Sequence, residues 1–328
     1  MPMKLLTFDT ISAALRDART VGVASHLRPD ADALGSTIAF ALWLRDSGKT
    51  VAAFNEEGVT SKFHYLPSHE IVSLPPATPF PCDVFVALDT SVKSRLGTVR
   101  EAIAPGTPLL NIDHHVSNEN FGDVNYIDPT APATGQILLE FFQHIGAHIS
   151  PEMATNLFAA ISTDTGSFQY DGTNERTFAA ASHLISCGVD VPSLSRAMYD
   201  TQPRRRFALL RHALNNAEFH CEDRIATFSL GLDVVADLQL LPEDNEGIID
   251  HLRAIEGVEA AVFFEELPEG KVRVSARSKN PALDVCKICK LFKGGGHPMA
   301  SGARVNGQLQ QVKCDFLKAL SDEIRNRN

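Results

Sequence analysis

The sequence predicts an α/β protein with a parallel-sheet N-terminal domain, a smaller C-terminal α/β domain and an active cleft between them. The first observation is a series of short, almost wholly apolar strands in the first half, typical of a parallel sheet buried on both faces. The second is that acidic and imidazole side chains follow these strands directly, at the carboxyl ends where open α/β sheets build their sites. The third is the length, since 328 residues are enough for two domains that each bury a core.

The first predicted strand, residues 21–25, leads into three side chains that can bind a metal, His26, Asp30 and Asp32. A helix is predicted to follow over residues 36–45. Asp32 lies near its start, where the helix dipole favours an anion.

Two further strands end in polar groups of the same kind. Residues 83–89 form an apolar strand that ends in Asp89. Residues 107–112 form another, which leads into the Asp-His-His triplet at 113–115. Because the carboxyl ends of parallel strands meet at one edge, these groups are expected to lie close together.

The fourth segment is a buried helix, predicted over residues 156–164, whose last turn presents Asp164. Taken alone, Asp32 and Asp164 are explained as residues at helix ends, and His26 as a satisfied polar residue. Asp89 is harder to explain in this way, because a carboxylate after a buried strand is costly unless it is paired or binds a cation. Together the four segments bring five Asp and three His to one place.

This set is rich in oxygen ligands, contains some imidazole and has no cysteine. Such a mixture suits Mn²⁺, Mg²⁺ or Fe²⁺ better than a structural zinc ion. The carboxylates outnumber the needs of one ion, so two cations bridged by an Asp are expected, and these would also offset the repulsion between the carboxylates. Water held by two such ions loses a proton near neutral pH and attacks phosphorus, which indicates hydrolysis of a phosphoester or phosphoanhydride.

The order of these motifs resembles that of the DHH phosphoesterase superfamily, which includes RecJ-type exonucleases, family II inorganic pyrophosphatases, cyclic-di-AMP phosphodiesterases and oligoribonucleases. All four motifs occur in order over residues 20–170: His-x-x-x-Asp-x-Asp, a strand-terminal Asp, Asp-His-His and a helical Asp. The resemblance implies that one ion is held by His26, Asp30 and Asp89, and the other by Asp32, Asp89, His114 and Asp164. It also implies a catalytic set in which Asp89 bridges the ions, His115 faces the substrate and Asp113 orients the two histidines.

A second group of polar residues lies near the end of the chain, at Gly294, Gly295, Gly296 and His297. Consecutive glycines let a backbone approach a ligand closely and expose its N–H groups, although such a run alone is also typical of a flexible surface loop. Arg277 and Ser278 end an alternating strand, and Arg at such a position can bind phosphate or stack on a base.

This segment is similar to the DHH-associated C-terminal domain of RecJ-like and oligoribonuclease-like members, a domain that family II pyrophosphatases lack. The pyrophosphatase interpretation is therefore set aside. The resemblance implies that Arg277, Ser278, His297 and the backbone of residues 294–296 bind the terminal phosphate and nucleoside of a substrate.

The formal net charge of −10 argues against tight binding of long duplex nucleic acid, which needs an extended basic surface. The local basic residues are Arg204, Arg205, Arg206, Arg273, Arg277, Lys279, Lys287, Lys290 and Lys293. Each is explained either as a solvated surface residue or as part of a substrate site, and the balance fits a short anionic substrate.

Among the six cysteines, only Cys286 and Cys289 have metal-like spacing, and one such pair is better explained by an amphipathic helix over residues 284–292. The other four are interpreted as small core hydrophobes in a reducing compartment. The chain has no apolar stretch long enough to cross a membrane and no signal-peptide pattern at its N-terminus, so a cytoplasmic location and no membrane partner are expected.

Domain boundaries are predicted at 1–190 for the metal-binding catalytic domain, 191–218 for a connecting helix and 219–328 for the substrate-binding domain. The stand-alone length points to the compact oligoribonuclease group, and a homodimer is possible. We expect a Mn²⁺-dependent enzyme, with Mg²⁺ or Fe²⁺ as alternatives. It would cut short single-stranded RNA of about two to five nucleotides to mononucleotides and dephosphorylate 3′-phosphoadenosine 5′-phosphate (pAp). The alternatives are a phosphodiesterase for pApA or cyclic-di-AMP, and a non-catalytic nucleotide-binding module.

Overall fold

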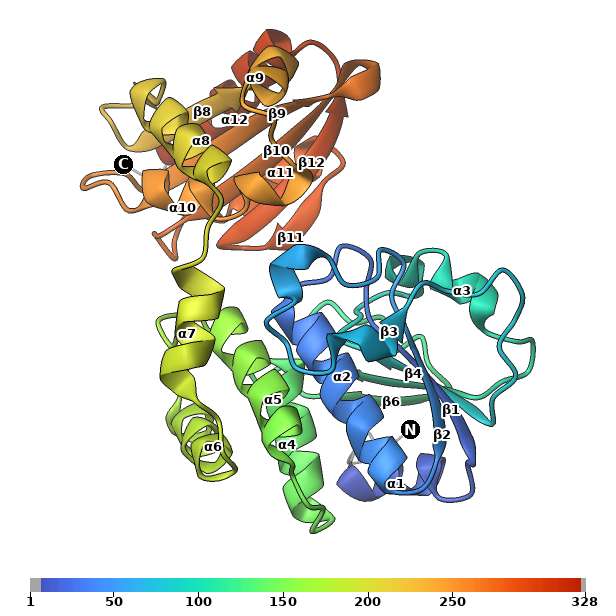
Figure 1. The fold of residues 1–328 in the computed structure, drawn as a ribbon. Helices are drawn as coiled ribbons and strands as arrows, with labels where there is room; N and C mark the ends of the chain where they lie inside the picture. Colours follow the sequence, from blue (N-terminus) through green and yellow to red (C-terminus); the bar gives the residue numbers. More distant parts are fainter. Residues whose placement is uncertain (1–6, 326–328) are drawn as a thin grey trace. The chain divides into compact units, whose positions relative to one another are not determined.

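The computed structural model describes residues 7–325, which form two compact units that divide between Thr201 and Gln202. Residues 1–6, part of the segment on which the signal-peptide prediction rests, lie outside this range. Each unit has its own sheet (Figure 1). The predicted fold class, a parallel-sheet N-terminal domain and a smaller C-terminal α/β domain, is confirmed.

The first sheet has six strands in the order β3-β2-β1-β4-β5-β6, and all neighbouring strands run parallel. Its strands are β1 (Thr20–Ala24), β2 (Thr50–Phe54), β3 (Val72–Ser73), β4 (Val84–Leu88), β5 (Leu109–Asp113) and β6 (Val124–Ile127). The strand order reverses between β1 and β4, and such a switch point is where open α/β sheets bind ligands, beyond the carboxyl ends.

Helices cover both faces of this sheet. The helices of this unit are α1 (Phe8–Leu15), α2 (Ala31–Asp46), α3 (Val99–Ala102), α4 (Thr134–His144), α5 (Pro151–Asp164), α6 (Glu175–Ser186) and α7 (Val191–Tyr199), of which α6 packs against α4 and α5. The larger core lies on the face covered by α2, α4 and α5, and a smaller one on the opposite face includes Phe85, Leu96 and Val99. The strands are therefore buried on both faces, which explains their continuous apolar sequences.

Helix α2 begins earlier than the sequence predicted, at Ala31 instead of Ser36. The carboxylate of Asp30 caps the helix by accepting a hydrogen bond from the backbone N–H of Ala33 at 2.9 Å. Gly35 then lies inside the helix, where an added Cβ would come within 2.5 Å of the Asn156 carbonyl oxygen on α5. This glycine reflects close helix packing, and Asp32 is thereby placed in the first helical turn.

The second unit contains a six-stranded sheet in the order β11-β12-β10-β9-β8-β7, in which only β8 and β9 pair in parallel. Its strands are β7 (Glu218–His220), β8 (Ile225–Leu230), β9 (Ala260–Leu267), β10 (Lys271–Ser278), β11 (Gly295–His297) and β12 (Ala300–Asn306). Its helices are α8 (Arg204–Asn215), α9 (Leu232–Asp237), α10 (Ile248–Arg253), α11 (Val285–Leu291) and α12 (Leu309–Arg325). The glycine run is thus part of a β-hairpin, and the flexible-loop interpretation is wrong.

The two faces of this second sheet are covered unequally. One face packs against α11 and α12, with core residues from β8, β9, β10 and β12. On the other face, α8 and α10 pack against β8 and β9. No core residue of that second cluster comes from β10, β12 or β11. Helix α10 also approaches β10, so the part of this face that carries no packed helix among the described residues is that of β12 and β11.

Several basic residues serve the fold of the second unit. Arg205 forms a 2.5 Å ion pair with buried Asp244, and Arg206 donates to the Asp244 carbonyl oxygen at 3.0 Å. Arg273 pairs with Glu265 at 2.8 Å, and the Lys279 ammonium donates to a backbone carbonyl. The three arginines are therefore half-buried structural residues, whereas Lys279 is exposed and agrees with the solvated-face interpretation.

The cysteines follow the predictions in part: Cys82, Cys187 and Cys221 are half-buried and pack against the cores. Cys286 and Cys289 are buried on α11, so the amphipathic-helix interpretation of this pair is confirmed. Cys314, in contrast, is exposed on α12 and does not fill the core. All six cysteines are free thiols.

Candidate metal centre

The structure brings all eight predicted acidic and imidazole residues of the first unit to the carboxyl edge of its sheet. They fall into three overlapping groups, within each of which the possible ligand atoms lie within 4.8 Å of one another. The groups are His26, Asp30 and Asp89; Asp32, His114 and Asp164; and Asp89, Asp113, His114 and His115. They come from the loop after β1 and the first turn of α2, from the residue that follows β4, from the end of β5 and the loop after it, and from the end of α5.

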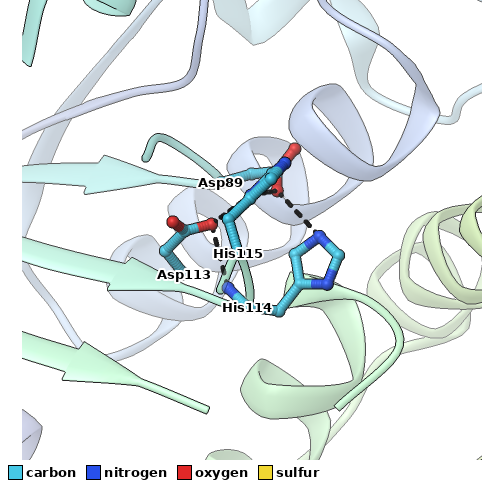
Figure 2. Close-up of side chains that lie close together, drawn as sticks. All are labelled: Asp89, Asp113, His114 and His115. Atoms are coloured by element: carbon cyan, nitrogen blue, oxygen red, sulfur yellow. Dashed lines mark hydrogen bonds and ion pairs between the residues drawn. The ribbon is translucent and has the colours of Figure 1, made fainter. Parts of the chain in front are cut away.

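Asp89 lies at the centre of this arrangement, and its two carboxylate oxygens face different histidines. Oδ2 is 3.3 Å from Nε2 of His26. Oδ1 is 3.5 Å from Nε2 of His114, as Figure 2 shows. The backbone φ of Asp89 is 51°, an uncommon value for a residue with a side chain. A carboxylate held between two ligand groups is the geometry that a bridge between two cations requires.

Two of the histidines are oriented by backbone carbonyls. Nδ1 of His26 lies 2.9 Å from the Leu27 oxygen, and Nδ1 of His114 lies 3.3 Å from the Ala131 oxygen. An N–H at Nδ1 that donates to a carbonyl leaves Nε2, the atom that faces the carboxylates, as the ligand nitrogen. Both rings are therefore set for metal binding.

Burial is deepest at the floor of the centre and decreases towards solvent. Asp32 and Asp89 are almost inaccessible, and His26 is 3% exposed. The side chains of Asp164 and Asp30 are 29% and 47% exposed. The centre therefore opens on the side of these two carboxylates, where a substrate can reach it.

The electrostatics of the centre require positive charge. Burial, together with the charges of Asp89 and Asp164, raises the pKa of Asp32 well above its usual value. Burial would also raise the pKa of Asp89, but contacts with His114 and His26 hold it well below its usual range. Burial would lower the pKa of His26, but Asp30 and Asp89 outweigh burial and raise it to about 10. Divalent cations would replace these imidazolium charges, so the donor set fits such ions.

Asp32 is held by a segment that the sequence analysis did not identify. Its carboxylate accepts hydrogen bonds from the backbone N–H groups of Thr134 and Gly135, at 2.7 and 2.8 Å, at the start of α4. The Thr134 hydroxyl donates to Asp89 at 3.1 Å, and the same segment provides the Ala131 carbonyl at His114. Backbone donors have no residue signature, which is why sequence patterns miss them.

An arginine on α6 fastens this segment. The Arg176 guanidinium makes two hydrogen bonds to the Glu140 carboxylate, at 2.7 and 3.2 Å. It also donates to the Thr130 hydroxyl at 3.0 Å and to the Asp128 carboxylate at 3.3 Å. The turn that carries the Ala131 carbonyl is thereby tied to two helices.

Asp113 and His115 form a hydrogen-bonded pair beside Asp89, whose Oδ1 lies 3.6 Å from Nδ1 of His115. Nδ1 of His115 lies 2.7 Å from Oδ1 of Asp113, which is fully buried (Figure 2). The other oxygen of Asp113 accepts a 2.6 Å hydrogen bond from Asn118, whose amide also donates to Asn111. His115 is thus oriented by a carboxylate instead of a carbonyl, which distinguishes it from His26 and His114.

The predicted substrate-binding residues of the second unit occupy neighbouring strands. Arg277 on β10 pairs with Ala300 on β12, which pairs with His297 on β11. Residues in register point to the same face, so Arg277 and His297 flank the small Ala300 on the partly uncovered face of the sheet. Ser278 points to the opposite face, where it is fully buried and donates to the Asn280 carbonyl at 2.9 Å. Its role in substrate binding stays a prediction.

The three glycines differ in the same alternating way. A Cβ on Gly294 would lie 2.7 Å from the Cβ of Ala303, and one on Gly296 would lie 2.6 Å from the Ala300 oxygen. A Cβ on Gly295 would meet nothing within 4 Å, and this residue lies in the row next to Arg277 and His297. Packing therefore explains Gly294 and Gly296, whereas Gly295 leaves open space on the uncovered face.

Comparison with known proteins agrees with this architecture. Residues 20–161 match the DHH family N-terminal domain, and residues 234–326 match the DHHA1 domain. The chain is 31% identical over 304 residues to the bifunctional oligoribonuclease and PAP phosphatase NrnA of Thermus thermophilus, covering 92% of this chain and 89% of that protein. It is 26% identical to the protein of the same name from Bacillus subtilis, over 87% of this chain and 89% of that protein.

A solved structure shares the fold over nearly the whole chain. The exopolyphosphatase-related protein of Bacteroides fragilis superposes with a TM-score of 0.91 at 23% identity, covering 99% of this chain and 100% of that chain. In residues 7–325, no helix has the length and apolar character that a membrane crossing requires. The resemblance drawn from the four motifs is confirmed, and the chain belongs to the DHH family, with a DHH N-terminal domain followed by a DHHA1 domain.

Proposed function

We propose that this protein is a metal-dependent phosphoesterase that degrades short RNA oligomers to mononucleotides and removes the 3′-phosphate of pAp. The observation that carries the proposal is Asp89, whose two oxygens face two separate groups of ligands. The relatives named oligoribonuclease and PAP phosphatase support the choice of substrates.

The proposed cofactor is a pair of divalent cations, of which Mn²⁺ is our first choice. One would be held by His26, Asp30 and Asp89, and the other by Asp32, Asp89, His114 and Asp164. When bound, such a pair acidifies water and offsets the charge that develops on a phosphoryl group. Mixed imidazole and carboxylate ligands support Mn²⁺ over Mg²⁺, which prefers oxygen alone.

The residues of the chain would supply orientation and proton transfer. With Nδ1 of His115 on Asp113, Nε2 would donate to a phosphate oxygen or to the leaving group. Asn118 would keep Asp113 in place for this step. Asp89 would bridge the two cations. Its side chain is buried and its backbone is held in an uncommon conformation, so its carboxylate would be fixed in one position for this role.

The second unit would bind the part of the substrate that does not react. Arg277 would form charge-assisted hydrogen bonds with a phosphate, and His297 would contact the nucleotide across Ala300. Gly295 would let the sugar-phosphate backbone approach the strand, since no other atom occupies that space.

The proposal extends to the location of the protein, the length of its substrate and its oligomeric state. A cytoplasmic location is supported by the six free thiols, one of them exposed, which suit reducing conditions. Short single-stranded RNA is preferred over long duplex because the net charge of −10 is unfavourable to an extended anion. A homodimer stays a prediction, which light scattering of the purified protein tests.

The decisive experiment is a panel of substrates assayed with Mn²⁺, Mg²⁺ and Fe²⁺. It contains RNA from two to five nucleotides, pApA, cyclic-di-AMP and pAp, with products separated by chromatography. Mononucleotides from the short RNA and AMP from pAp are expected. Preferential turnover of pApA or cyclic-di-AMP would select the dinucleotide phosphodiesterase instead.

A pair of matched variants separates enzyme from binding module. Asp89→Asn removes the proposed bridge, whereas Asp83→Asn makes the same change before the other end of β4, where Asp83 accepts from the N–H groups of Arg19 and Thr20. Activity should be lost only in Asp89→Asn. Nucleotide binding that survives Asp89→Asn and chelation, without turnover in the wild type, would favour the non-catalytic module.

A further inference from the structure

The uncovered part of the second sheet, over β12 and β11, carries a cation that the proposed function leaves unused. Arg304 on β12 is exposed, whereas its neighbours Ala303 and Val305 pack into the core on the opposite face. Because side chains alternate along a strand, Arg304 points to the same face as Ala300 and Gly302. It therefore shares the uncovered face with Arg277 and His297.

The arginine directly opposite Arg304 is already engaged. Arg304 pairs in register with Arg273 on β10, and Arg273 forms an ion pair with Glu265. No hydrogen bond or ion pair of the Arg304 guanidinium occurs within residues 7–325. An exposed cation beside a neutralised one is available for an anion from outside the protein.

The surface between the two cationic positions is lined by small residues. Gly302 lies between Ala300 and Arg304 on β12, and it pairs with Ser275 on one side and Gly295 on the other. Arg304 is four residues from Ala300, about 13 Å along the strand. An extended nucleotide strand can lie along this strip without meeting a large side chain.

We propose that Arg304 binds a second, more distant phosphate of the RNA strand and so sets the preference for substrate length. The inference rests on the proposed function and extends it. A phosphate anchored near Arg277 leaves Arg304 out of reach of a dinucleotide. A strand of four or five nucleotides spans the strip and gains the additional contact.

The test compares oligomers of different length in wild type and variants. Arg304→Ala should leave kcat/KM for the dinucleotide within about twofold and lower it about tenfold for the tetramer, as expected for loss of one charge-assisted contact. Arg304→Lys should retain part of the preference for the tetramer over the dinucleotide. Lys318→Ala is the matched control, since this exposed lysine lies on α12, which covers the opposite face.

A binding measurement without turnover separates this inference from the proposed function. Full-length protein is titrated with the tetramer and the dinucleotide in EDTA, at several salt concentrations. Arg304→Ala should reduce the steepness of log binding constant against log salt concentration by about 0.7 for the tetramer, as expected for loss of one phosphate contact. The slope for the dinucleotide should stay unchanged. Equal effects of Arg304→Ala on both lengths, or no effect on either, would overturn the inference. Failure of the wild type to cut any oligomer would overturn only the proposed function.

Discussion

Two neighbouring glycines in the β11–β12 hairpin permit a prediction in which stability and function respond in opposite ways. Gly294→Ala places a Cβ 2.7 Å from the Cβ of Ala303 and against the Gly302 carbonyl. Overpacking of this kind costs about 1–3 kcal/mol. For a unit of this size the expected fall in melting temperature is roughly 4–12 °C.

Gly295→Ala adds the same methyl group to open space. The backbone of Gly295 lies outside the left-handed region, so alanine is tolerated there, and the less flexible unfolded chain should add about 0.4–1 kcal/mol to the free energy of unfolding. If a substrate backbone approaches this residue, the methyl group occupies the space it needs. Gly295→Ala should therefore raise KM for the dinucleotide at least several-fold without loss of stability.

Calorimetric melting in EDTA and steady-state kinetics with Mn²⁺ measure the two effects. If the KM of Gly295→Ala equals that of the wild type, the substrate does not approach this strand closely. An unchanged melting temperature in Gly294→Ala would refute the packing explanation, and with it the assignment of the two faces.

Three further predictions concern the metal centre. Arg176→Ala should weaken one of two Mn²⁺ binding events about 10- to 100-fold in calorimetry, because Arg176 holds the turn whose Ala131 carbonyl orients His114. Arg224→Ala, the control, removes an ion pair in the second unit and should change neither binding event. Asn118→Ala should lower kcat more than Mn²⁺ affinity, since Asn118 supports Asp113; an equal loss in both would argue against a proton-transfer role for this pair. In EDTA, His26 has a folded pKa of about 10 against 6.5 unfolded, so its stabilising charge is fully present below pH 6.5 and is lost as pH rises towards 10. The melting temperature should fall over that interval, and the fall should be shallower in His26→Gln.

The residues of the candidate metal centre were predictable because each polar residue directly after an apolar stretch marks the end of a buried strand. An apolar strand buried on both faces can be recognised from composition, and in a parallel sheet its last residue must lie at the common carboxyl edge. Asp89 and the triplet that begins with Asp113 follow such strands directly. The start of α2 lies five residues earlier than predicted, and Gly35 falls inside the helix, where it packs closely against Asn156 on α5, a long-range contact that has no local sequence pattern.

The supporting contacts were not predictable in the same way. The groups that hold Asp32 are backbone N–H groups more than a hundred positions away, and any residue can supply these. The turn of Ala131 depends on Arg176, whose partners lie on other elements. Long-range polar contacts of this kind leave no repeating pattern of residue types in the sequence, so they become visible only in the folded structure.

The same reasoning explains why the basic residues were harder to assign than the acidic ones. Buried carboxylates are costly and must be explained, whereas an exposed arginine is compatible with solvent, with an ion pair or with a ligand. The fold commits Arg205, Arg206, Arg273 and Lys279 to internal contacts. Arg277 donates one hydrogen bond to the Ala276 carbonyl at 3.2 Å and is otherwise half-exposed beside β12, and Lys287 and Lys290 are exposed on α11. A cationic surface reduced in this way can neutralise only a few phosphates. Because affinity for long RNA grows with the number of phosphates neutralised, the second unit would gain little additional affinity from a long strand, which supports the proposed preference for short ones.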